Sequence, residues 1–341
     1  MWGETHNHVT AGSIAHTQHA QDGSGASEAR CAGWAVLGWC DPRNGGRLPA
    51  LVAEVAVGPA LTLAVTLALP LRAASGESPR VVKTVLHGRS APNGVATEVL
   101  LPPGWRPGQP ALLMVFLHDG WGTEKSFRRH GLAALADGMM RGGALPPVVI
   151  ASPRHRGTFI VDSRRGQMES FVAEDLVPAL EREFPGAGGS PDRRSIWGIS
   201  MGGYGALKMA LRHQGVYGRV AALAPWVQPL SWEAYERHRT WWSRRLLEPV
   251  FGRTRAESRF EANDVAAIAA AADPGGVPPL LIRTGSRDRW EPGALDLVAA
   301  MRRRGIAVDA ASIPGARHRW SDWRRAAPAV LRFLTATGSD R

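Results

Sequence analysis

The chain has 341 residues, of which 44% are hydrophobic and 21% are charged. This excludes a largely disordered protein and suits one α/β enzyme domain with an extension. Its 41 Lys and Arg outnumber 30 Asp and Glu, for a net charge of +11, but the arginines are spread along the chain without a nucleic-acid motif. We therefore expect solvated basic faces and no nucleic-acid partner. The two cysteines, Cys31 and Cys40, exclude a disulfide framework and a four-ligand zinc site.

Residues 1–50 differ in composition from the rest of the chain. They are rich in small and polar residues, and His6, His8, His16 and His19 lie among them without helical or strand periodicity. Such a segment buries too little apolar surface to fold, so it predicts a disordered N-terminal extension. Adventitious metal binding by the histidines is the alternative that we rank below a tail.

An apolar segment follows at residues 51–76. The run from 55 to 71 is uncharged, arginines precede it and small residues follow it, a pattern that resembles an export signal and is short for a membrane span. Glu54 and the long preceding stretch count against a signal, unless the true start lies downstream of Met1. A packed helix of a soluble protein is the rival interpretation. We favour an exported or membrane-associated protein over a cytoplasmic one, with membrane contact only if residues 55–71 are an anchor.

Residues 80–337 show the regular pattern of an α/β domain. The run ALLMVFL at residues 111–117 is typical of a strand buried on both faces. Residues 171–184 have apolar positions at helical spacing with acidic residues between them, which indicates an amphipathic helix. Further strands are predicted at Val81–Leu86, Val95–Leu101, Val148–Ala151, Ser195–Ile199, Val220–Ala224, Leu280–Thr284 and Val308–Ile313, with a turn at Ala91–Gly94, and helices at Gly202–His213, Leu295–Arg304 and Ala326–Thr335.

The alternation of strands and helices implies a mostly parallel central sheet with helices on both faces. Residues 226–265 interrupt this alternation. They carry Trp226, Trp232, Trp241 and Trp242 among charged residues. We expect an aromatic-rich insertion over the carboxyl ends of the strands.

The motif that carries the chemistry is the G-x-S-x-G at residues 198–202, centred on Ser200. It follows a predicted strand and opens a predicted helix, which is the strand–turn–helix context of the nucleophile elbow in the α/β-hydrolase fold. The sharp turn exposes the serine hydroxyl at the top of the sheet. A glycine-rich turn with a helix-capping serine is the structural alternative.

A serine hydroxyl needs a base to take its proton, and in this fold the acid and the histidine follow the serine in that order. Of the three downstream histidines, His213 ends the helix that Ser200 opens, and His238 lies among arginines in the insertion. His318 lies in a loop after the last predicted strand. His318 is therefore the predicted base.

Asp288 is the predicted acid, because it lies just past the strand that ends at Thr284. Its carboxylate would fix the histidine tautomer and stabilise the imidazolium. Glu291 is the second candidate, and pairing of Asp288 with a neighbouring arginine on the surface is the structural alternative.

The tetrahedral intermediate needs two backbone N–H donors. One is predicted at Met201, directly after the nucleophile, and the other in the loop of residues 118–122 after the strand ALLMVFL. We expect the His118 side chain to be structural, hydrogen-bonded or packed beneath this loop, and not a base.

Five segments together resemble the esterase D-like branch of the α/β hydrolases: FLHDGWG, FVAEDLVPALEREF, SIWGISMGGYGALKMAL, TGSRD and PGARHRWSDW. This branch includes S-formylglutathione hydrolases, feruloyl and acetylxylan esterases, enterochelin esterases and mycolyltransferases. The resemblance implies that the second oxyanion donor is the N–H of Trp121, with Gly120 its neighbour. Arg317 and Arg319 flank the base where relatives often have small residues, and the loop after the first buried strand lacks the cysteine pattern of S-formylglutathione hydrolases.

The leading functional hypothesis is a serine esterase that cleaves a small-molecule ester or thioester through an acyl-enzyme, with no cofactor and no metal. An acyltransferase of the mycolyltransferase type would use the same triad, with a sugar hydroxyl in place of water. A non-catalytic binding module on this scaffold is the third hypothesis. Trp226 and Trp320 are the aromatic candidates for substrate binding, although such residues more often serve packing.

Overall fold

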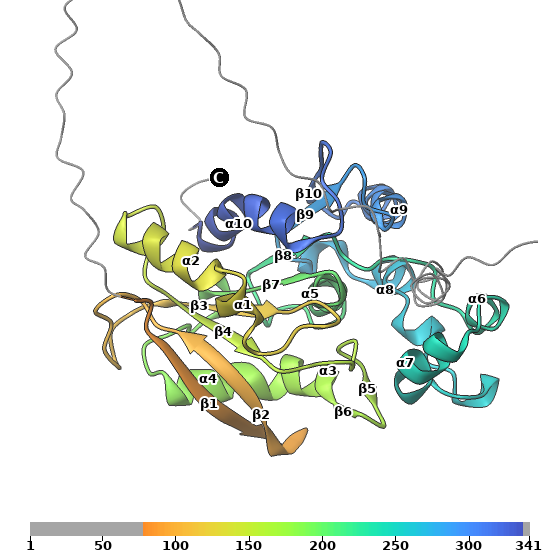
Figure 1. The fold of residues 1–341 in the computed structure, drawn as a ribbon, viewed down its shortest axis with the longest axis horizontal. Coiled ribbons are helices and arrows are strands. Elements are labelled where there is room, and N and C mark those ends of the chain that lie inside the picture. The colour runs from red at the N-terminus through yellow and green to blue at the C-terminus, as the bar shows by residue number, and fades with distance from the viewer. Residues whose placement is uncertain (1–77, 337–341) are drawn as a thin grey trace, which may run out of the picture. The chain divides into compact units, whose positions relative to one another are not determined.

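A computed structural model describes residues 78–336, and every structural statement below concerns that part of the chain. One sheet lies at its centre, and a separate pair of two-residue strands lies beside it (Figure 1). The strands are β1 Val81–Gly88, β2 Ala91–Leu100, β3 Leu112–Leu117, β4 Val148–Pro153, β5 Asp162–Ser163, β6 Gly166–Gln167, β7 Arg194–Ile199, β8 Arg219–Leu223, β9 Leu280–Gly285 and β10 Val308–Ile313. The helices are α1 Ser126–Arg129, α2 Leu132–Arg141, α3 Met168–Ser170, α4 Leu176–Glu183, α5 Met201–Arg212, α6 Trp232–Arg237, α7 Trp241–Phe251, α8 Val265–Ala271, α9 Glu291–Arg303 and α10 Trp320–Thr335.

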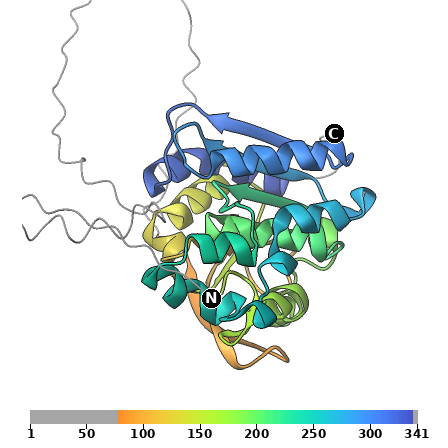
Figure 2. The same cartoon turned by 90° about the vertical axis from the view of Figure 1, so that its right-hand side faces the viewer.

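The eight-stranded sheet has the order β1-β2-β4-β3-β7-β8-β9-β10. β2 pairs antiparallel with β1 and with β4, and every other neighbouring pair is parallel. Figure 2 shows the two edges, with the orange hairpin β1–β2 at the bottom and the blue strand β10 at the top. The mostly parallel sheet predicted from the sequence is therefore confirmed.

Successive residues of β3 enter opposite cores. Leu113, Val115 and Leu117 belong to the core that includes α4 and α5, whereas Met114 and Phe116 belong to the core that includes α2 and α10. Figure 1 shows α2 and α10 on one side of the sheet and α4 on the other. Because side chains alternate between the faces of a strand, an uninterrupted apolar run needs cover on both faces, which these helices supply.

The hairpin β1–β2 corrects one prediction. The turn expected at Ala91–Gly94 lies instead at residues 89–90, and residues 92–94 are extra residues of β2 opposite His87. Their proline has no N–H to donate and Gly94 has φ +79°, and both properties suit a β-bulge as well as a turn. The local chemistry was therefore informative, but the position of the turn was wrong.

The helix expected at residues 171–184 is present and begins earlier. α3, a π-helical turn at Phe171–Asp175 and α4 follow one another without interruption. Pro178 lies inside α4, where its missing N–H and its ring disfavour the regular bond to the carbonyl four residues earlier. The wider π turn directly before α4 accommodates this proline.

Residues 226–265 form α6, α7 and short 3₁₀ turns. The Ser231 and Thr240 side chains cap the two helices by accepting hydrogen bonds from backbone N–H groups. The Phe260 ring stacks on Tyr235 at 5.0 Å and on Phe251 at 4.8 Å. The insertion thus has an aromatic interior that is continuous with the core of α5.

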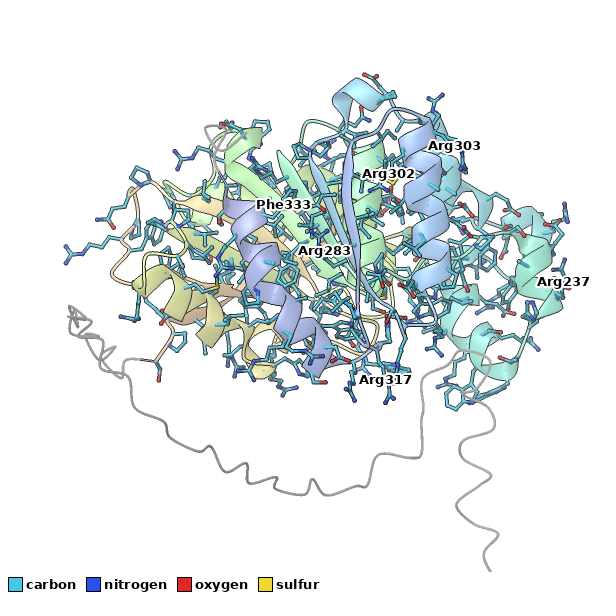
Figure 3. All side chains as sticks on the ribbon, turned by 90° about the horizontal axis from the view of Figure 1, so that it is seen from above. Arg237, Arg283, Arg302, Arg303, Arg317 and Phe333 are labelled. Carbon is cyan, nitrogen blue, oxygen red and sulfur yellow. The ribbon has the colours of Figure 1, made fainter. Side chains whose placement is uncertain are left out.

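Arginines lie on separate elements of the surface. Figure 3 shows Arg237 on α6, Arg302 and Arg303 on α9, and Arg317 before α10. No helix in residues 78–336 is long and apolar enough to cross a membrane. The predictions for residues 1–50 and 51–76, including the export or membrane segment, lie outside the described residues.

Candidate active site

Ser200 occupies the sharp turn between β7 and α5 with φ 56° and ψ −115°. Its N–H donates to the Leu223 carbonyl at 3.0 Å, and its own carbonyl accepts from the N–H groups of Tyr204 and Trp226 at 3.0 Å each. A non-glycine residue at positive φ costs about 1–3 kcal/mol and persists only where its surroundings hold it. Three backbone hydrogen bonds from different segments hold Ser200 in this conformation.

The glycines of the motif are required by close backbone contacts. A Cβ on Gly198 would lie 2.2 Å from the Gly202 carbonyl carbon, and a Cβ on Gly202 would lie 2.1 Å from the Leu117 carbonyl oxygen. Real Cβ atoms do not approach backbone this closely, so the turn excludes any side chain at these two positions. The G-x-S-x-G spacing is therefore a steric requirement of the turn.

The structure brings Ser200, His318 and Asp288 together as a candidate triad. His318 Nε2 lies 2.8 Å from Ser200 Oγ, and His318 Nδ1 lies 2.7 Å from Asp288 Oδ2. The buried Asp288 also accepts from the Trp290 N–H at 2.9 Å. The Trp323 ring meets the His318 ring edge-on at 4.8 Å. With Nδ1 protonated toward the aspartate, Nε2 is free to accept the serine proton.

The alternative residues are placed elsewhere. The Glu291 carboxylate accepts from the Ser312 hydroxyl. His213 contacts Glu169 at 3.1 Å, and His238 is exposed on the insertion. Of the acids and bases considered from the sequence, only those of the triad lie within hydrogen-bond distance of one another in residues 78–336.

His118 supports the loop that follows β3. Its Nδ1 lies 2.8 Å from the Asp119 carbonyl, and its Nε2 accepts from the His155 N–H at 3.2 Å. Burial, opposed by the hydrogen bond to Asp119 and assisted by the charges of Arg154 and Arg156, lowers the pKa of His118 to about 4. A neutral, fully buried imidazole is a structural group, as expected from the sequence.

The same loop faces the triad. Burial raises the pKa of the Asp119 carboxyl, while the backbone N–H of Trp121 and the charge of His318 act in the opposite direction. Met201 is the first residue of α5, and N–H groups in the first turn of a helix have no intrahelical acceptor. The N–H groups of Met201, Gly120 and Trp121 remain the predicted oxyanion donors, and that of Trp121 hydrogen-bonds the Asp119 carboxylate.

The two aromatic candidates lie in different surroundings. Trp226 is 5% exposed and packs against Phe159 at 5.0 Å, so most of its ring serves packing. Trp320 is half-buried, stacks on His130 at 3.7 Å and meets Trp323 at 5.3 Å. Trp320 has the more accessible ring of the two.

Two residues near the triad were missed from the sequence. Asp119 interacts electrostatically with His318. The Trp323 ring contacts the His318 ring. Both residues lie within segments that the sequence singled out, HDGWG and RWSDW. No local pattern indicates, however, that these two segments lie close together in the fold. In residues 78–336, no three His, Cys, Asp or Glu side chains gather as a metal site.

Known proteins resemble this chain in sequence and in fold. The family model described as "Putative esterase" matches residues 90–334. S-formylglutathione hydrolase of Mus musculus is 32% identical over 124 residues, which are 36% of this chain and 39% of that protein. An esterase of Mycobacterium tuberculosis is 31% identical over 131 residues, 37% of this chain and 28% of that protein. The match thus spans about two fifths or less of these relatives.

Solved structures share the fold. A fluorophosphonate-binding serine hydrolase of Staphylococcus aureus aligns with a TM-score of 0.63 at 17% identity, over 76% of this chain and 100% of that chain. A ferulic acid esterase aligns with a TM-score of 0.61 at 21% identity, over 75% of this chain and 97% of that chain. These likenesses establish the α/β-hydrolase fold.

Proposed function

From the fact that this chain belongs to the "Putative esterase" family, we propose that it is a serine esterase that hydrolyses small-molecule carboxylic esters or thioesters. The observation that carries the proposal is the continuous relay from Ser200 Oγ through His318 to Asp288, with contacts of 2.8 Å and 2.7 Å. A serine on a strained turn, beside an imidazole that a buried carboxylate orients, is built for acyl transfer.

In the first half of the reaction, Ser200 Oγ attacks the acyl carbon and its proton passes to His318 Nε2. The carbonyl oxygen becomes an oxyanion, which the N–H of Met201 and one N–H from Gly120 or Trp121 would stabilise. His318 then gives its proton to the leaving oxygen or sulfur as the bond to the acyl carbon breaks. The alcohol or thiol departs and an acyl-enzyme remains.

In the second half, water takes the place of the alcohol. His318 accepts a proton from the water as its oxygen attacks the acyl carbon, and returns that proton to Ser200 Oγ when the acyl–serine bond breaks. The products are a carboxylic acid and the free enzyme. Asp288 holds the ring through Nδ1 and stabilises the imidazolium. Every step uses groups of the protein, substrate and water.

A rate panel tests the proposal. p-Nitrophenyl acetate, butyrate and palmitate would be offered to the unaltered protein, to Ser200→Ala and to Ser190→Ala. The Ser190 hydroxyl donates to Asp192 at the start of a 3₁₀ turn. We expect Ser200→Ala to lose roughly 10⁴-fold or more in kcat and Ser190→Ala to keep its rate. Chain-length preference would define the acyl pocket.

Two outcomes would redirect the assignment. A folded protein that neither turns over these esters nor reacts with a fluorophosphonate would be a binding module. Faster release of p-nitrophenol on addition of a sugar or alcohol, with the acylated acceptor as product, would identify an acyltransferase with the same acyl-enzyme.

A further inference from the structure

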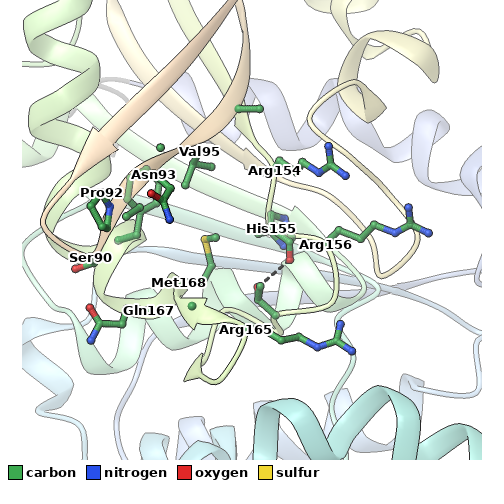
Figure 4. A pocket seen from close by; sticks show the side chains of 16 residues that line it. Ser90, Pro92, Asn93, Val95, Arg154, His155, Arg156, Arg165, Gln167 and Met168 are labelled. Atoms are coloured by element: carbon green, nitrogen blue, oxygen red, sulfur yellow. Dashed lines mark hydrogen bonds between the residues drawn. The ribbon is translucent and has the colours of Figure 1, made fainter.

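A cavity of about 490 Å³ lies at the same edge of the sheet as the candidate triad, beyond the carboxyl end of β4. Its walls come from the β1–β2 hairpin, from the loop after β4 and from the β5–β6 hairpin (Figure 4). None of the triad residues lines it. The cavity is therefore distinct from the reacting centre.

The charge of this cavity has one sign. Arg154, Arg156 and Arg165 are among its 16 lining residues, and no aspartate or glutamate is. Figure 4 shows the three arginine side chains on one side of the cavity and Asn93 and Gln167 on the other. A cluster of guanidinium groups without carboxylates is self-repulsive and attracts an anion.

The guanidinium groups of the three arginines form no ion pairs within the described part of the chain. Within residues 78–336, the guanidinium groups of Arg154 and Arg156 have no hydrogen-bond or ion-pair partner, and both side chains are exposed. Arg165 donates only to two backbone carbonyls, those of Gly157 at 3.2 Å and Arg245 at 3.3 Å. Their charge is therefore available to a ligand.

The cationic side of the cavity adjoins the loop that faces the triad. His155 lines the cavity and stacks on His118 at 3.7 Å with an interplanar angle of 10°. The charges of Arg154 and Arg156 reach His118, and the next residue, Asp119, interacts with His318. Rings and backbone in direct contact thus connect the arginines to the loop that holds the proposed oxyanion donors.

We propose that this cavity binds the anionic end of the ester substrate, so that the preferred substrates carry a second, ionised group beside the ester. Met168, Phe171 and Val95 supply apolar wall for the body of such a ligand. Guanidinium groups bind carboxylate and phosphate by paired, charge-assisted hydrogen bonds. The proposal rests on the proposed esterase function and adds its substrate class.

Matched pairs of esters test it. The p-nitrophenyl esters of butyrate, hexanoate and octanoate would be compared with the half-esters of succinate, adipate and suberate, which replace the terminal methyl by carboxylate at equal carbon number. We expect kcat/KM to favour the anionic member at one of the three lengths. Arg154→Gln and Arg156→Gln should each lower the anionic-to-neutral ratio about tenfold, and the double variant further.

Arg303→Gln is the control for net charge, because Arg303 is exposed on α9 near the opposite edge of the sheet. It should leave the ratio unchanged. The ratio should also fall as KCl rises, because salt screens exposed charges. Turnover of both esters with a ratio that the cavity variants do not alter would overturn this inference and leave the esterase function standing.

A binding measurement separates failure of this inference from failure of the esterase function. Calorimetric titration of Ser200→Ala with free suberate, adipate or inorganic phosphate should show saturable binding that Arg154→Gln weakens and Arg303→Gln does not. Comparison of the affinities for the dicarboxylates and for phosphate identifies which anion the cavity prefers. Absence of saturable binding by all three would overturn the inference, even if no ester is hydrolysed.

Discussion

At the scale of single residues, the buried Asp288 offers the sharpest test of the triad. Asp288→Asn would present an amide to His318 Nδ1 and favour the wrong tautomer, so we expect kcat to fall by about 10⁴-fold with little change in KM. Glu291→Gln is the matched control, because Glu291 contacts Ser312 instead. Steady-state kinetics of both variants decide between the two acids, and a larger loss in Glu291→Gln would contradict the assignment.

The sequence predicted these residues by their order along the chain and by their position after strands. Ser200, Asp288 and His318 follow β7, β9 and β10, whose carboxyl ends lie at one edge of the sheet. What could not be predicted is contact between distant loops. Nothing local indicates that Asp119 lies near His318 or that Trp323 packs on it, because both contacts depend on how the loops cross that edge.

At the scale of elements, the turn into α5 depends on missing side chains. Gly202→Ala would place a Cβ against the Leu117 carbonyl at 2.1 Å, so we expect strong destabilisation and loss of turnover. Gly138→Ala, at an exposed position of helix α2, meets nothing within 4 Å and should stabilise the protein by about 0.5–1 kcal/mol. Urea unfolding would measure both, and similar effects of the two substitutions would contradict the steric argument.

The elements that the sequence predicted best are those with one dominant pattern. β10 occupies Val308–Ile313 as expected, and β3 and β9 differ from the expectation by one residue. Helices were predicted too short at their N-termini: α10 begins at Trp320 and α9 at Glu291. The first turns of these two helices carry polar and aromatic residues, which obscure the helical spacing of the apolar positions. Helix α2 was not predicted, although it covers one face of the sheet.

At the scale of the whole molecule, a buried lysine connects segments far apart in the sequence. Lys208 Nζ in α5 donates to Glu169 at 2.7 Å, to the Asn263 side chain at 2.7 Å and to the Ile160 carbonyl at 2.9 Å. Burial, against the attraction of Glu169, lowers the pKa of Lys208 to about 8. The lysine is therefore protonated at neutral pH and fixes the insertion and the loop after β4 to α5.

Removal of this lysine should loosen all three segments. We expect Lys208→Met to lower the free energy of unfolding by about 3–5 kcal/mol, because a buried carboxylate loses its cation. Lys125→Met is the control, since its surface pair with Glu124 at 3.8 Å contributes about 0–1 kcal/mol. Urea denaturation gives both values. A loss no larger than that of the control would show that Arg212, which pairs with Glu169 at 2.8 Å, and His213 satisfy Glu169 without the lysine.

The same cluster predicts a pH dependence. Burial opposes ionisation of Glu169, but the hydrogen bonds from His213 and Lys208 and the charges of Lys208 and Arg212 prevail and lower its pKa from 4.5 to about 2. The unfolded chain therefore takes up the proton first, so this stability is complete above pH 4.5 and is lost as the pH falls toward 2. Glu169→Gln should show a flatter decline between pH 5 and pH 3 in urea unfolding. An unchanged slope would assign the acid sensitivity to other carboxyls.

The strained backbone at Ser200 has a consequence for heat resistance. At φ 56° and ψ −115°, glycine is unstrained, whereas serine and alanine are strained. Ser200→Gly should therefore melt higher than Ser200→Ala, by the equivalent of about 1 kcal/mol, in a calorimetric scan of the two inactive proteins. Selection for thermal stability alone would therefore favour replacement of the nucleophile. At this turn, the residue that gives activity is not the residue that gives the highest thermal stability.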